Sequence, residues 1–327
     1  MPLWAGIDEA GYGPPLGPLV VAGAAFTVRQ VPREGMLWDL LKDAVTRQAR
    51  GSDGRIVVND SKQVYSPGVG LRRLEEGVLT FLRAGAGVSP ARAGDLFAAL
   101  GCEQDPAPWF ERAADFRLPL ATNESALESM AAVLRETLDR RAVKMVALRA
   151  ALVSPSEFNR IVALTRNKSL LLFQKCGLIL QDMWPWAQGP HSHVLVDKHG
   201  GRTRYRKLLL DVFPDCRCDI LREDAERSVY YVADVAARTS SGGECRSLLV
   251  SFQEGADARA LPTALGSMVA KYVREIHMLA FNAYWQERLS GLRPTSGYHT
   301  DARRFMRDIA PALRAEGVDA SALVRLR

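Results

Sequence analysis

Short apolar runs alternate along the chain with segments in which apolar residues recur every three or four positions. This pattern predicts strands separated by helices. Apolar runs at residues 3–9 and 19–28 are bounded by glycine and proline, and they predict two strands in a hairpin-like pair. Later apolar runs predict further strands over 143–153, 193–197, 216–222, 229–236 and 248–253. Strands that alternate with helices indicate an α/β fold.

Helical spacing marks three longer segments. Residues 72–83 carry a helical pattern. Ser154-Pro155-Ser156-Glu157 places proline in a first helical turn and has the spacing of a capping box, so it predicts a helix from about Glu157 to Met183. Over about 263–289, apolar residues recur at spacings of three and four, which predicts a long helix with a buried stripe. Glycine and proline are frequent over 84–123, which indicates an inserted element.

Composition is that of a protein with a packed core and a surplus of arginine. The 327 residues are 47% hydrophobic, and 43 cationic against 37 acidic side chains give a net charge of +6. Of the cations 35 are arginine and 8 lysine, a skew that fits either phosphate partners or a coding bias. No run of about 20 apolar residues predicts a membrane span.

Cysteine usage and the first residues favour a cytoplasmic protein. The chain begins without the charged and apolar regions of a signal peptide. Its five cysteines are an odd, sparse set, and we expect reduced thiols in the core. Cys216 and Cys218 would share one face of a strand, but no second pair completes a zinc site.

Four carboxylates stand where the predicted elements could bring them together. Asp8 and Glu9 end the first strand, Asp197 ends a later strand, and Glu275 lies on the long helix. Strand-terminal acids can converge in the crevice of an α/β sheet. Their combined charge of about −4 would be costly unpaired, and two Mg²⁺ ions would balance it. This is the charge arrangement of a two-metal phosphodiester hydrolase.

Each acid also has an ordinary interpretation. Adjacent strand residues face opposite sides, so Asp8 and Glu9 share a site only if the strand ends or twists there, as Gly11 and Gly13 allow. Otherwise the Asp-Glu pair is a solvated turn, and Asp197 begins another. Glu275 follows Lys271 by four residues, which on a helix is a common surface ion pair.

Several motifs, in a fixed order along the chain, favour a functional site over these ordinary interpretations. Gly6 to Val20 (GIDEAGYGPPLGPLV) resembles the opening signature of the type 2 ribonucleases H, the HII/HIII family. Asn59 to Lys62 (NDSK) is similar to the D-S-K segment of that family, and Val194 to Asp197 (VLVD) to the strand with its third acid. The segments 255–275 and 296–300 resemble the later blocks of the family, in the same order.

The resemblance implies a fold and an activity. The fold would be ribonuclease H-like α/β: a mixed five-stranded sheet flanked by helices, with insertions and a helical C-terminal part. The family cleaves the RNA strand of RNA–DNA hybrids with Mg²⁺ or Mn²⁺, and metal-activated water leaves a 5′-phosphate and a 3′-hydroxyl. Asp8, Glu9 and Asp197 fall on its catalytic, metal-binding acids. Glu275 falls where HII enzymes carry Asp and HIII enzymes carry Glu.

The same resemblance implies a set of substrate-binding residues. In the family a Gly-x-Gly loop approaches the ribose 2′-hydroxyl, and a later tyrosine packs on the next nucleotide. Where HII enzymes carry a cation between these glycines, this chain has Tyr12. The positions implied are Gly11, Tyr12, Gly13, Lys62, Lys271 and Tyr298.

Basic residues near the third acid fit a nucleic-acid partner. Residues 198–207 hold five cations without an acid, and Arg303, Arg304 and Arg307 follow the long helix. Such cations would contact phosphates without reading sequence, or would simply form a solvated face.

The chain also departs from the family. It exceeds a minimal member by roughly a hundred residues, mostly in 84–142 and 200–245. We expect these to be elaborations of one catalytic domain over 1–310, followed by a tail over 311–327. Alternatives are a hybrid-binding protein that no longer cleaves, and a junction-resolving or transposase-like nuclease. Any protein partners are unknown from the sequence.

Overall fold

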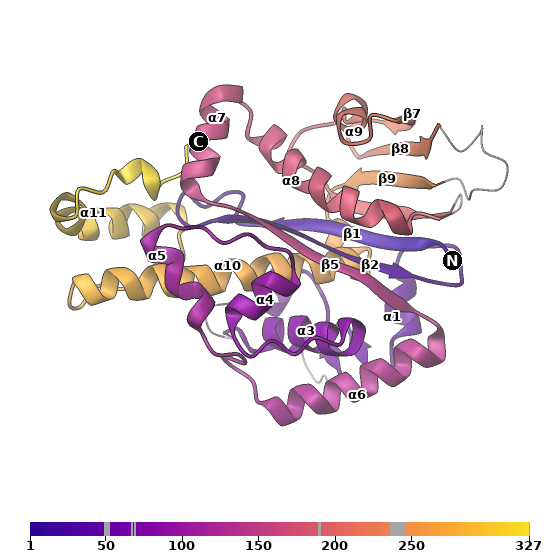
Figure 1. Cartoon of the computed structure of the whole chain (residues 1–327), viewed down its shortest axis with the longest axis horizontal. Coiled ribbons are helices and arrows are strands. Elements are labelled where there is room, and N and C mark those ends of the chain that lie inside the picture. The colour runs from indigo at the N-terminus through magenta and orange to yellow at the C-terminus, as the bar shows by residue number, and fades with distance from the viewer. Residues whose placement is uncertain (49–52, 67, 69, 189–190, 236–245, 327) are drawn as a thin grey trace.

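A seven-stranded mixed sheet forms the centre of the molecule (Figure 1). The computed structural model describes residues 1–48, 53–66, 68, 70–188, 191–235 and 246–326. Most strands coincide with predicted apolar runs. The strands of the sheet are β1 (Leu3–Ala10), β2 (Leu19–Thr27), β5 (Lys144–Val153), β6 (His193–Asp197), β7 (Cys216–Glu223), β8 (Arg227–Asp234) and β9 (Ser247–Gln253), and β3 (Val45–Thr46) and β4 (Ile56–Val57) pair separately.

The sheet has seven strands instead of the expected five, in the order β5-β2-β1-β6-β9-β8-β7. β1 pairs antiparallel with β2 and parallel with β6, and β6 pairs parallel with β9. The first five strands in this order form the mixed sheet that we expected. The antiparallel hairpin β7–β8 adds two strands along β9, and it comes from the elaboration over 200–245. Residues 236–245 of that elaboration, with Cys245, lie outside the described residues.

Helices cover both faces of the sheet (Figure 1). α7, α8 and α9 lie on one face. On the other face α10 packs against β1, β2 and β5, α3 packs on α10, and α6 packs on α3. This mixed α/β arrangement confirms the predicted fold class. The α-helices are α1 (Met36–Leu40), α2 (Ser61–Val64), α3 (Arg72–Phe81), α4 (Ala93–Ala99), α5 (Pro108–Glu111), α6 (Glu124–Arg141), α7 (Pro155–Thr165), α8 (Lys168–Met183), α9 (Arg206–Val212), α10 (Leu261–Arg288) and α11 (His299–Ala315). Shorter helical turns are η1 (Leu82–Ala86), η2 (Arg112–Asp115), η3 (Trp184–Trp186), η5 (Ala256–Ala258) and η6 (Ala320–Ala322).

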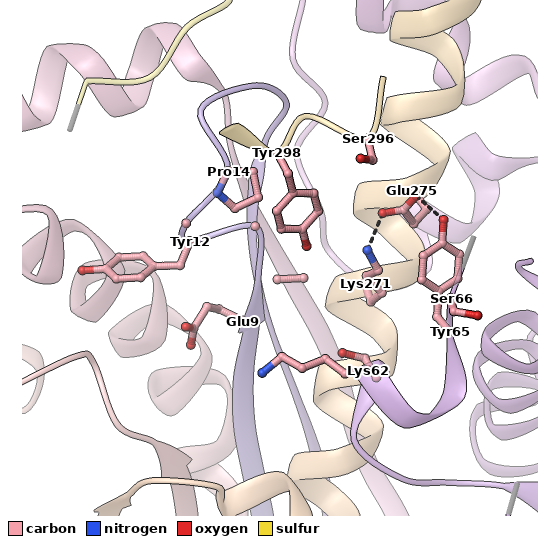
Figure 2. Close-up of a pocket in the computed structure, with 14 residues that line it drawn as sticks. Glu9, Tyr12, Pro14, Lys62, Tyr65, Ser66, Lys271, Glu275, Ser296 and Tyr298 are labelled. Carbon is pink, nitrogen blue, oxygen red and sulfur yellow. Dashed lines mark hydrogen bonds and ion pairs between the residues drawn. The ribbon is translucent and has the colours of Figure 1, made fainter. Parts of the chain in front are cut away.

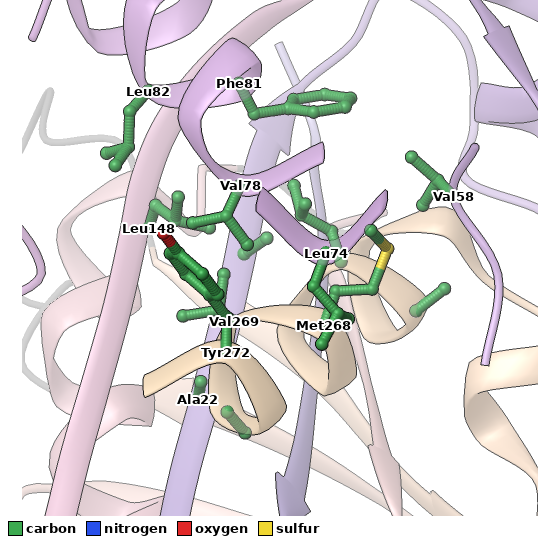
Figure 3. Close-up of a cluster of buried hydrophobic side chains, with 14 of the residues drawn as sticks. Ala22, Val58, Leu74, Val78, Phe81, Leu82, Leu148, Met268, Val269 and Tyr272 are labelled. Atoms are coloured by element: carbon green, nitrogen blue, oxygen red, sulfur yellow. The ribbon is translucent and has the colours of Figure 1, made fainter. Parts of the chain in front are cut away.

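Alternation along the central strands divides the apolar residues between two cores. On β1, Leu3, Ala5 and Ile7 pack toward α8, whereas Trp4 packs toward α10. Because successive strand side chains point to opposite faces, one apolar strand serves both cores. Figure 3 shows the second core, in which Leu74 and Val78 of α3 meet Met268, Val269 and Tyr272 of α10 over the sheet.

The helix predicted over 157–183 is divided into α7 and α8. Its start follows the prediction, since the Ser154 hydroxyl accepts the Glu157 N–H at 3.1 Å. α7 ends at Thr165, and the next residue, Arg166, has a left-handed φ of 51°. Asn167 then caps α8 by accepting the N–H groups of Ser169 and Leu170, each at 3.1 Å. Apolar spacing continues across this break, which is why the pattern predicted one helix.

The elaboration over 84–142 is tied to α3 and α10 by a buried carboxylate. Glu75 of α3 is fully buried and accepts the N–H groups of Ala121 and Thr122 at 2.6 and 2.8 Å. The Tyr272 hydroxyl of α10 donates to the same carboxylate at 2.6 Å. At the other end of the chain, α11 runs across the predicted boundary at residue 310.

No helix in the described ranges is long and apolar enough to cross a membrane.

Candidate active site

Three of the four predicted acids converge at one end of the sheet. Oxygen atoms of Asp8, Glu9 and Asp197 all lie within 4.8 Å of one another. The parallel pairing of β1 with β6 stops at Ile7 and Val196, whereas β1 continues along β2 as far as Ala10. The acids therefore lie where β6 ends and β1 no longer has a partner strand on that side. Among the described residues they form the one group of His, Cys, Asp or Glu with this metal-binding geometry.

Local hydrogen bonding explains how neighbouring residues on one strand share the site. The Asp8 carboxylate turns along the strand and accepts the N–H of Glu9 at 2.7 Å. Ser267 of α10 lies beside the Asp8 carboxyl and partly offsets the rise in its pKa. The conflict expected from strand alternation is thus resolved by the side chain, within an unbroken strand.

Asp197 is oriented by the loop that follows β9. Its carboxylate accepts the N–H of Ala256 at 3.0 Å. Gly255, with a φ of 65°, turns the chain here in a conformation that glycine adopts without strain. The loop thereby directs backbone donors at the acid. These N–H groups leave the other lone pairs of the carboxylate available for a cation.

Burial and mutual repulsion favour protonation of this cluster. Burial, followed by the charges of Glu9 and Asp197, raises the pKa of Asp8 well above its usual range. Burial and the charge of Asp197 raise the pKa of Glu9 to about 8, although Lys62 acts in the opposite direction. Burial also raises the pKa of Asp197. A bound cation would replace these protons, because it favours the charged form of each carboxylate.

A further carboxylate near the cluster, Asp257, was missed as a site residue by sequence reasoning. Burial, then the charges of Asp60 and Asp197, raise its pKa to about 6. Its charge also contributes to the raised pKa values of Asp8 and Glu9. The available signal was an acid two residues after the glycine that ends an apolar strand.

Glu275 lies in the adjoining pocket, but its carboxylate is directed elsewhere. Lys271 Nζ lies 2.6 Å and Arg274 Nη1 3.1 Å from Oε1 of Glu275, and the Tyr65 hydroxyl donates to Oε2 at 2.9 Å. The ion pair with Lys271 is therefore present, and it is buried, in contrast to the surface pair that the spacing suggested. Glu275 is not part of the three-acid group.

A pocket of about 500 Å³ extends from Glu9, one of the three acids, to Glu275 (Figure 2). In Figure 2 Lys62 points toward Glu9 from α2, and Lys271 and Glu275 come from the neighbouring α10. Every residue that the resemblance implied for substrate binding lines this pocket. The lining is Glu9, Ala10, Gly11, Tyr12, Gly13, Pro14, Ser61, Lys62, Tyr65, Ser66, Lys271, Glu275, Ser296 and Tyr298.

Two tyrosines of the pocket have different orientations. Tyr298 points into the pocket and is 49% exposed (Figure 2). Tyr12 points away from Glu275, and Lys168 Nζ lies 5.1 Å from the centre of its ring. This distance is within the range of a cation–π contact. The loop at residues 11–13 therefore has a cation beside it, supplied by α8.

The two glycines of that loop also differ. Gly11 has a φ of 86°, and a Cβ there would come within 2.6 Å of Arg274 Nε and of the Pro18 carbonyl oxygen. No atom lies within 4 Å of the corresponding position at Gly13. Close packing therefore requires glycine at residue 11 but not at residue 13.

Some of the cations predicted to contact phosphates are bonded instead to groups of the protein itself. Lys198 is buried, and its ammonium group donates to the Ala225 carbonyl. Arg206 donates to the Cys218 carbonyl at 3.0 Å. Arg304 forms ion pairs with Asp301 and Asp308, at 2.7 and 2.9 Å. Other predicted cations are exposed, namely Arg204, Lys207, Arg303 and Arg307.

Comparisons with known proteins give structural similarity only. No protein-family model and no curated protein matches the chain. Similar solved structures include ribonuclease HII of Archaeoglobus fulgidus in its complex with PCNA (16% identity, TM-score 0.42, 99% of this chain and 94% of that one). Others are the Mn²⁺ complex of Bst ribonuclease HIII (12%, 0.40, 99% and 66%) and ribonuclease H2 of Pyrococcus horikoshii OT3 (15%, 0.38, 98% and 92%). At such identities and TM-scores, the chemistry of this chain has to be argued from its own residues.

Proposed function

We propose that this chain is a metal-dependent endonuclease that cleaves the RNA strand of RNA–DNA hybrids, leaving a 5′-phosphate and a 3′-hydroxyl. The observation that carries the proposal is the convergence of Asp8, Glu9 and Asp197 within 4.8 Å at the end of the sheet. The Gly11–Gly13 loop and the cations of the pocket lie directly beside it. This combination matches, residue by residue, the motifs that resemble type 2 ribonucleases H.

The residues present fit Mg²⁺ or Mn²⁺. Both are hard cations that prefer carboxylate oxygens, and the cluster supplies three such groups with raised pKa values. Asp8, Glu9 and Asp197 would hold the metal, and Glu275 would join them once its side chain turns from Lys271. When bound, divalent ions activate water and stabilise the charge that develops on the phosphate.

Some residues of the chain would orient the metal-binding carboxylates, and others would bind the substrate. The Ala256 N–H fixes Asp197, and the Glu9 N–H holds Asp8, so the two carboxylates are oriented before substrate arrives. Lys62 and Lys271 supply positive charge to the pocket, where a phosphodiester backbone would lie.

Recognition of RNA is assigned to the loop and to Tyr298. Glycine at residue 11 and the open space around Gly13 let the backbone of the loop approach a ribose 2′-hydroxyl, the group that distinguishes RNA from DNA. The exposed ring of Tyr298 offers a surface on which a sugar or base could pack. Tyr12, which points away, would shape the loop.

The test is a cleavage assay with three substrates and two metals. An RNA–DNA hybrid, a DNA duplex with one embedded ribonucleotide and a four-way DNA junction are incubated with Mg²⁺, Mn²⁺ or EDTA. We expect metal-dependent cleavage at ribonucleotides, with ends that a ligase joins without prior phosphorylation. Cleavage of the junction alone would replace the proposal with a resolving nuclease on a ribonuclease H-like fold.

The engagement of Glu275 favours one second candidate, a protein that binds hybrids without cutting them. Three donors satisfy its carboxylate, so the fourth acid is tied to the protein and not to the three-acid group. Tight binding of the RNA–DNA hybrid, with no cleavage in either metal, would establish this candidate instead.

We further propose that residues 1–310 form the catalytic unit, elaborated over 84–142 and 200–245, and that it acts in the cytoplasm. Free thiols at Cys102, Cys176 and Cys218 support a reducing location. Protease protection in fractionated cells would test the location.

A further inference from the structure

A buried arginine far along the chain holds the loop that lines the candidate active site. Arg325 is 4% exposed, and its Nη2 donates to the carbonyl oxygens of Gly11 and Pro14. Its backbone N–H also donates to the Pro15 carbonyl at 2.8 Å. One residue thus contacts the beginning and the end of the turn that presents Tyr12 and Gly13 to the pocket.

The segment around Arg325 is itself fixed to the protein. Val324 forms an antiparallel bridge with Leu16, directly after the loop. On α7, the Asn159 amide donates to the carbonyls of Ser321 and Val324 at 2.8 and 2.7 Å, and its oxygen accepts the Leu326 N–H at 2.6 Å. Arg325 therefore holds the loop from an anchored support.

This arrangement is expensive in stability. The guanidinium has no carboxylate partner among the described residues, and its Nε and Nη1 make no hydrogen bond there. Burial and the nearby charge of Arg274 lower the pKa of Arg325 to about 9. A buried, partly unsatisfied cation generally destabilises a fold relative to an apolar side chain of similar size. Stability alone therefore does not account for an arginine at this position.

We propose that Arg325 is a positioning residue, which fixes the backbone of the Gly11–Pro15 loop in the geometry that contacts the nucleic acid. A monodentate contact would allow the loop to rock, whereas two carbonyls on one planar guanidinium define its orientation. The inference deepens the proposed function, on which its catalytic consequence rests. The loop-holding itself is a property of the free protein and is measured without substrate.

The experiment compares Arg325→Met with Arg325→Lys, and uses Arg314→Met as a matched control. Arg314 is exposed on α11, away from the pocket lining. Hydrogen exchange is followed at the amides of residues 11–13, together with the melting temperature and with kcat and KM on an RNA–DNA hybrid. Arg325→Met should keep its melting temperature within about 5 °C, because the lost hydrogen bonds and the removed buried charge offset each other.

In Arg325→Met we expect exchange at residues 11–13 to rise at least tenfold and kcat to fall about tenfold or more, while Arg314→Met matches wild type. Arg325→Lys should recover part of both, since an ammonium group can still donate to a carbonyl. Wild-type exchange at the loop in Arg325→Met would overturn the proposal, and so would a normal kcat with a large fall in melting temperature.

A second variant tests the proposal if Arg325→Met does not fold. Asn159→Ala releases the support of Arg325 without touching the buried charge, and it should also raise exchange at residues 11–13. Unchanged exchange there would overturn the proposal. If wild type binds or cuts no hybrid while the exchange contrast persists, the loop-holding is supported and the proposed function fails, so the two results are separable.

Discussion

Lys271 and Glu275, one turn apart on α10, form an ion pair of 2.6 Å whose side chains are 13% and 10% exposed. Arg274 contributes a second cation to the same carboxylate at 3.1 Å. Glu275 is thus the shared anion of two cations at the edge of the pocket. Its substitution affects the charge balance of the fold as well as any reaction.

For Glu275→Gln we expect a loss of roughly 3 kcal/mol in the free energy of unfolding, because removal of one partner leaves buried charge unpaired. Glu275→Gln combined with Lys271→Met should recover much of that stability. If Glu275 is a metal ligand, the double variant remains inactive in the cleavage assay. Full activity in the double variant would restrict Glu275 to a structural role.

Glu275→Asp tests position at constant charge. The shorter side chain draws the carboxylate back by one methylene, and errors of about 1 Å can reduce turnover ~100-fold. We expect kcat to fall further than KM changes. Equal kcat in Glu275→Asp and wild type would show that the carboxylate does not have to reach the other acids.

Asp8→Asn should abolish cleavage and leave the fold intact. The substitution removes one charge from a cluster whose members repel each other, so the metal-free protein should melt at the same temperature or higher. Glu136→Gln, at an exposed position on α6, is the matched control. Wild-type cleavage by Asp8→Asn would contradict the assignment of the metal site.

The raised pKa of Glu9 couples stability to pH. Between about 4.5 and about 8 the folded protein keeps a proton that the unfolded chain releases, so the free energy of unfolding falls as the pH rises through this window. Metal binding replaces the proton and restores stability at the upper end. Urea denaturation at pH 5 and pH 8.5 should therefore show a larger stabilisation by Mg²⁺ at pH 8.5.

Glu9→Gln provides the control for this linkage. It should flatten the pH dependence of the metal-free protein and reduce the effect of Mg²⁺. An equal effect of Mg²⁺ at both pH values in wild type would exclude Glu9 from the cation site.

Gly11→Ala and Gly13→Ala form a matched pair within one loop. Gly11→Ala combines a left-handed φ with a clash against Arg274 and Pro18, and should cost about 1–3 kcal/mol and most of the activity. Gly13→Ala meets open space, so its melting temperature should match wild type. Thermal melts and the hybrid assay decide, and equal loss in both variants would contradict the difference seen between the glycines.

The orientation of Tyr12 predicts a weak preference for single ribonucleotides. HII enzymes carry a cation at this position, and a charge-assisted hydrogen bond is about twice as strong as a neutral one. Here Tyr12 points away and Lys168 stands behind its ring. We expect similar rates on a long hybrid and on a duplex with one ribonucleotide. A hundredfold faster cut of the single ribonucleotide would refute this interpretation.

The sequence predicts most helices and strands because the residues that determine them are close together in the chain. β1, β2, β5, β6 and β9 are apolar runs bounded by turns, and their ends lie within about two residues of the prediction. The break between α7 and α8 is not signalled, because Arg166 adopts a left-handed conformation without being glycine and the apolar spacing continues. The hairpin strands were identified, but their addition to the sheet edge depends on pairing that no local pattern encodes.

The site, too, has features that the sequence predicts and features that depend on the fold. The sequence identifies the residues of the pocket through ordered motifs, and the structure brings them to one place. The direction of the Glu275 carboxylate depends on three donors, among them Tyr65 from another element, so spacing alone could not give it. Asp257 lies within a family-like block, but its closeness to Asp60 and Asp197 depends on the fold. Arg325 lies outside every motif, because its contact with Gly11 joins distant segments.

The bond between Arg325 and Gly11 spans 314 residues of sequence. During translation, the turn after β1 leaves the ribosome long before its partner exists. A hairpin of β1 and β2 can form early, but β6 must then insert beside β1, and the turn is secured only after α11 has been made. High contact order of this kind slows folding. A nascent chain therefore carries Asp8 and Glu9 for most of its synthesis without a finished site around them.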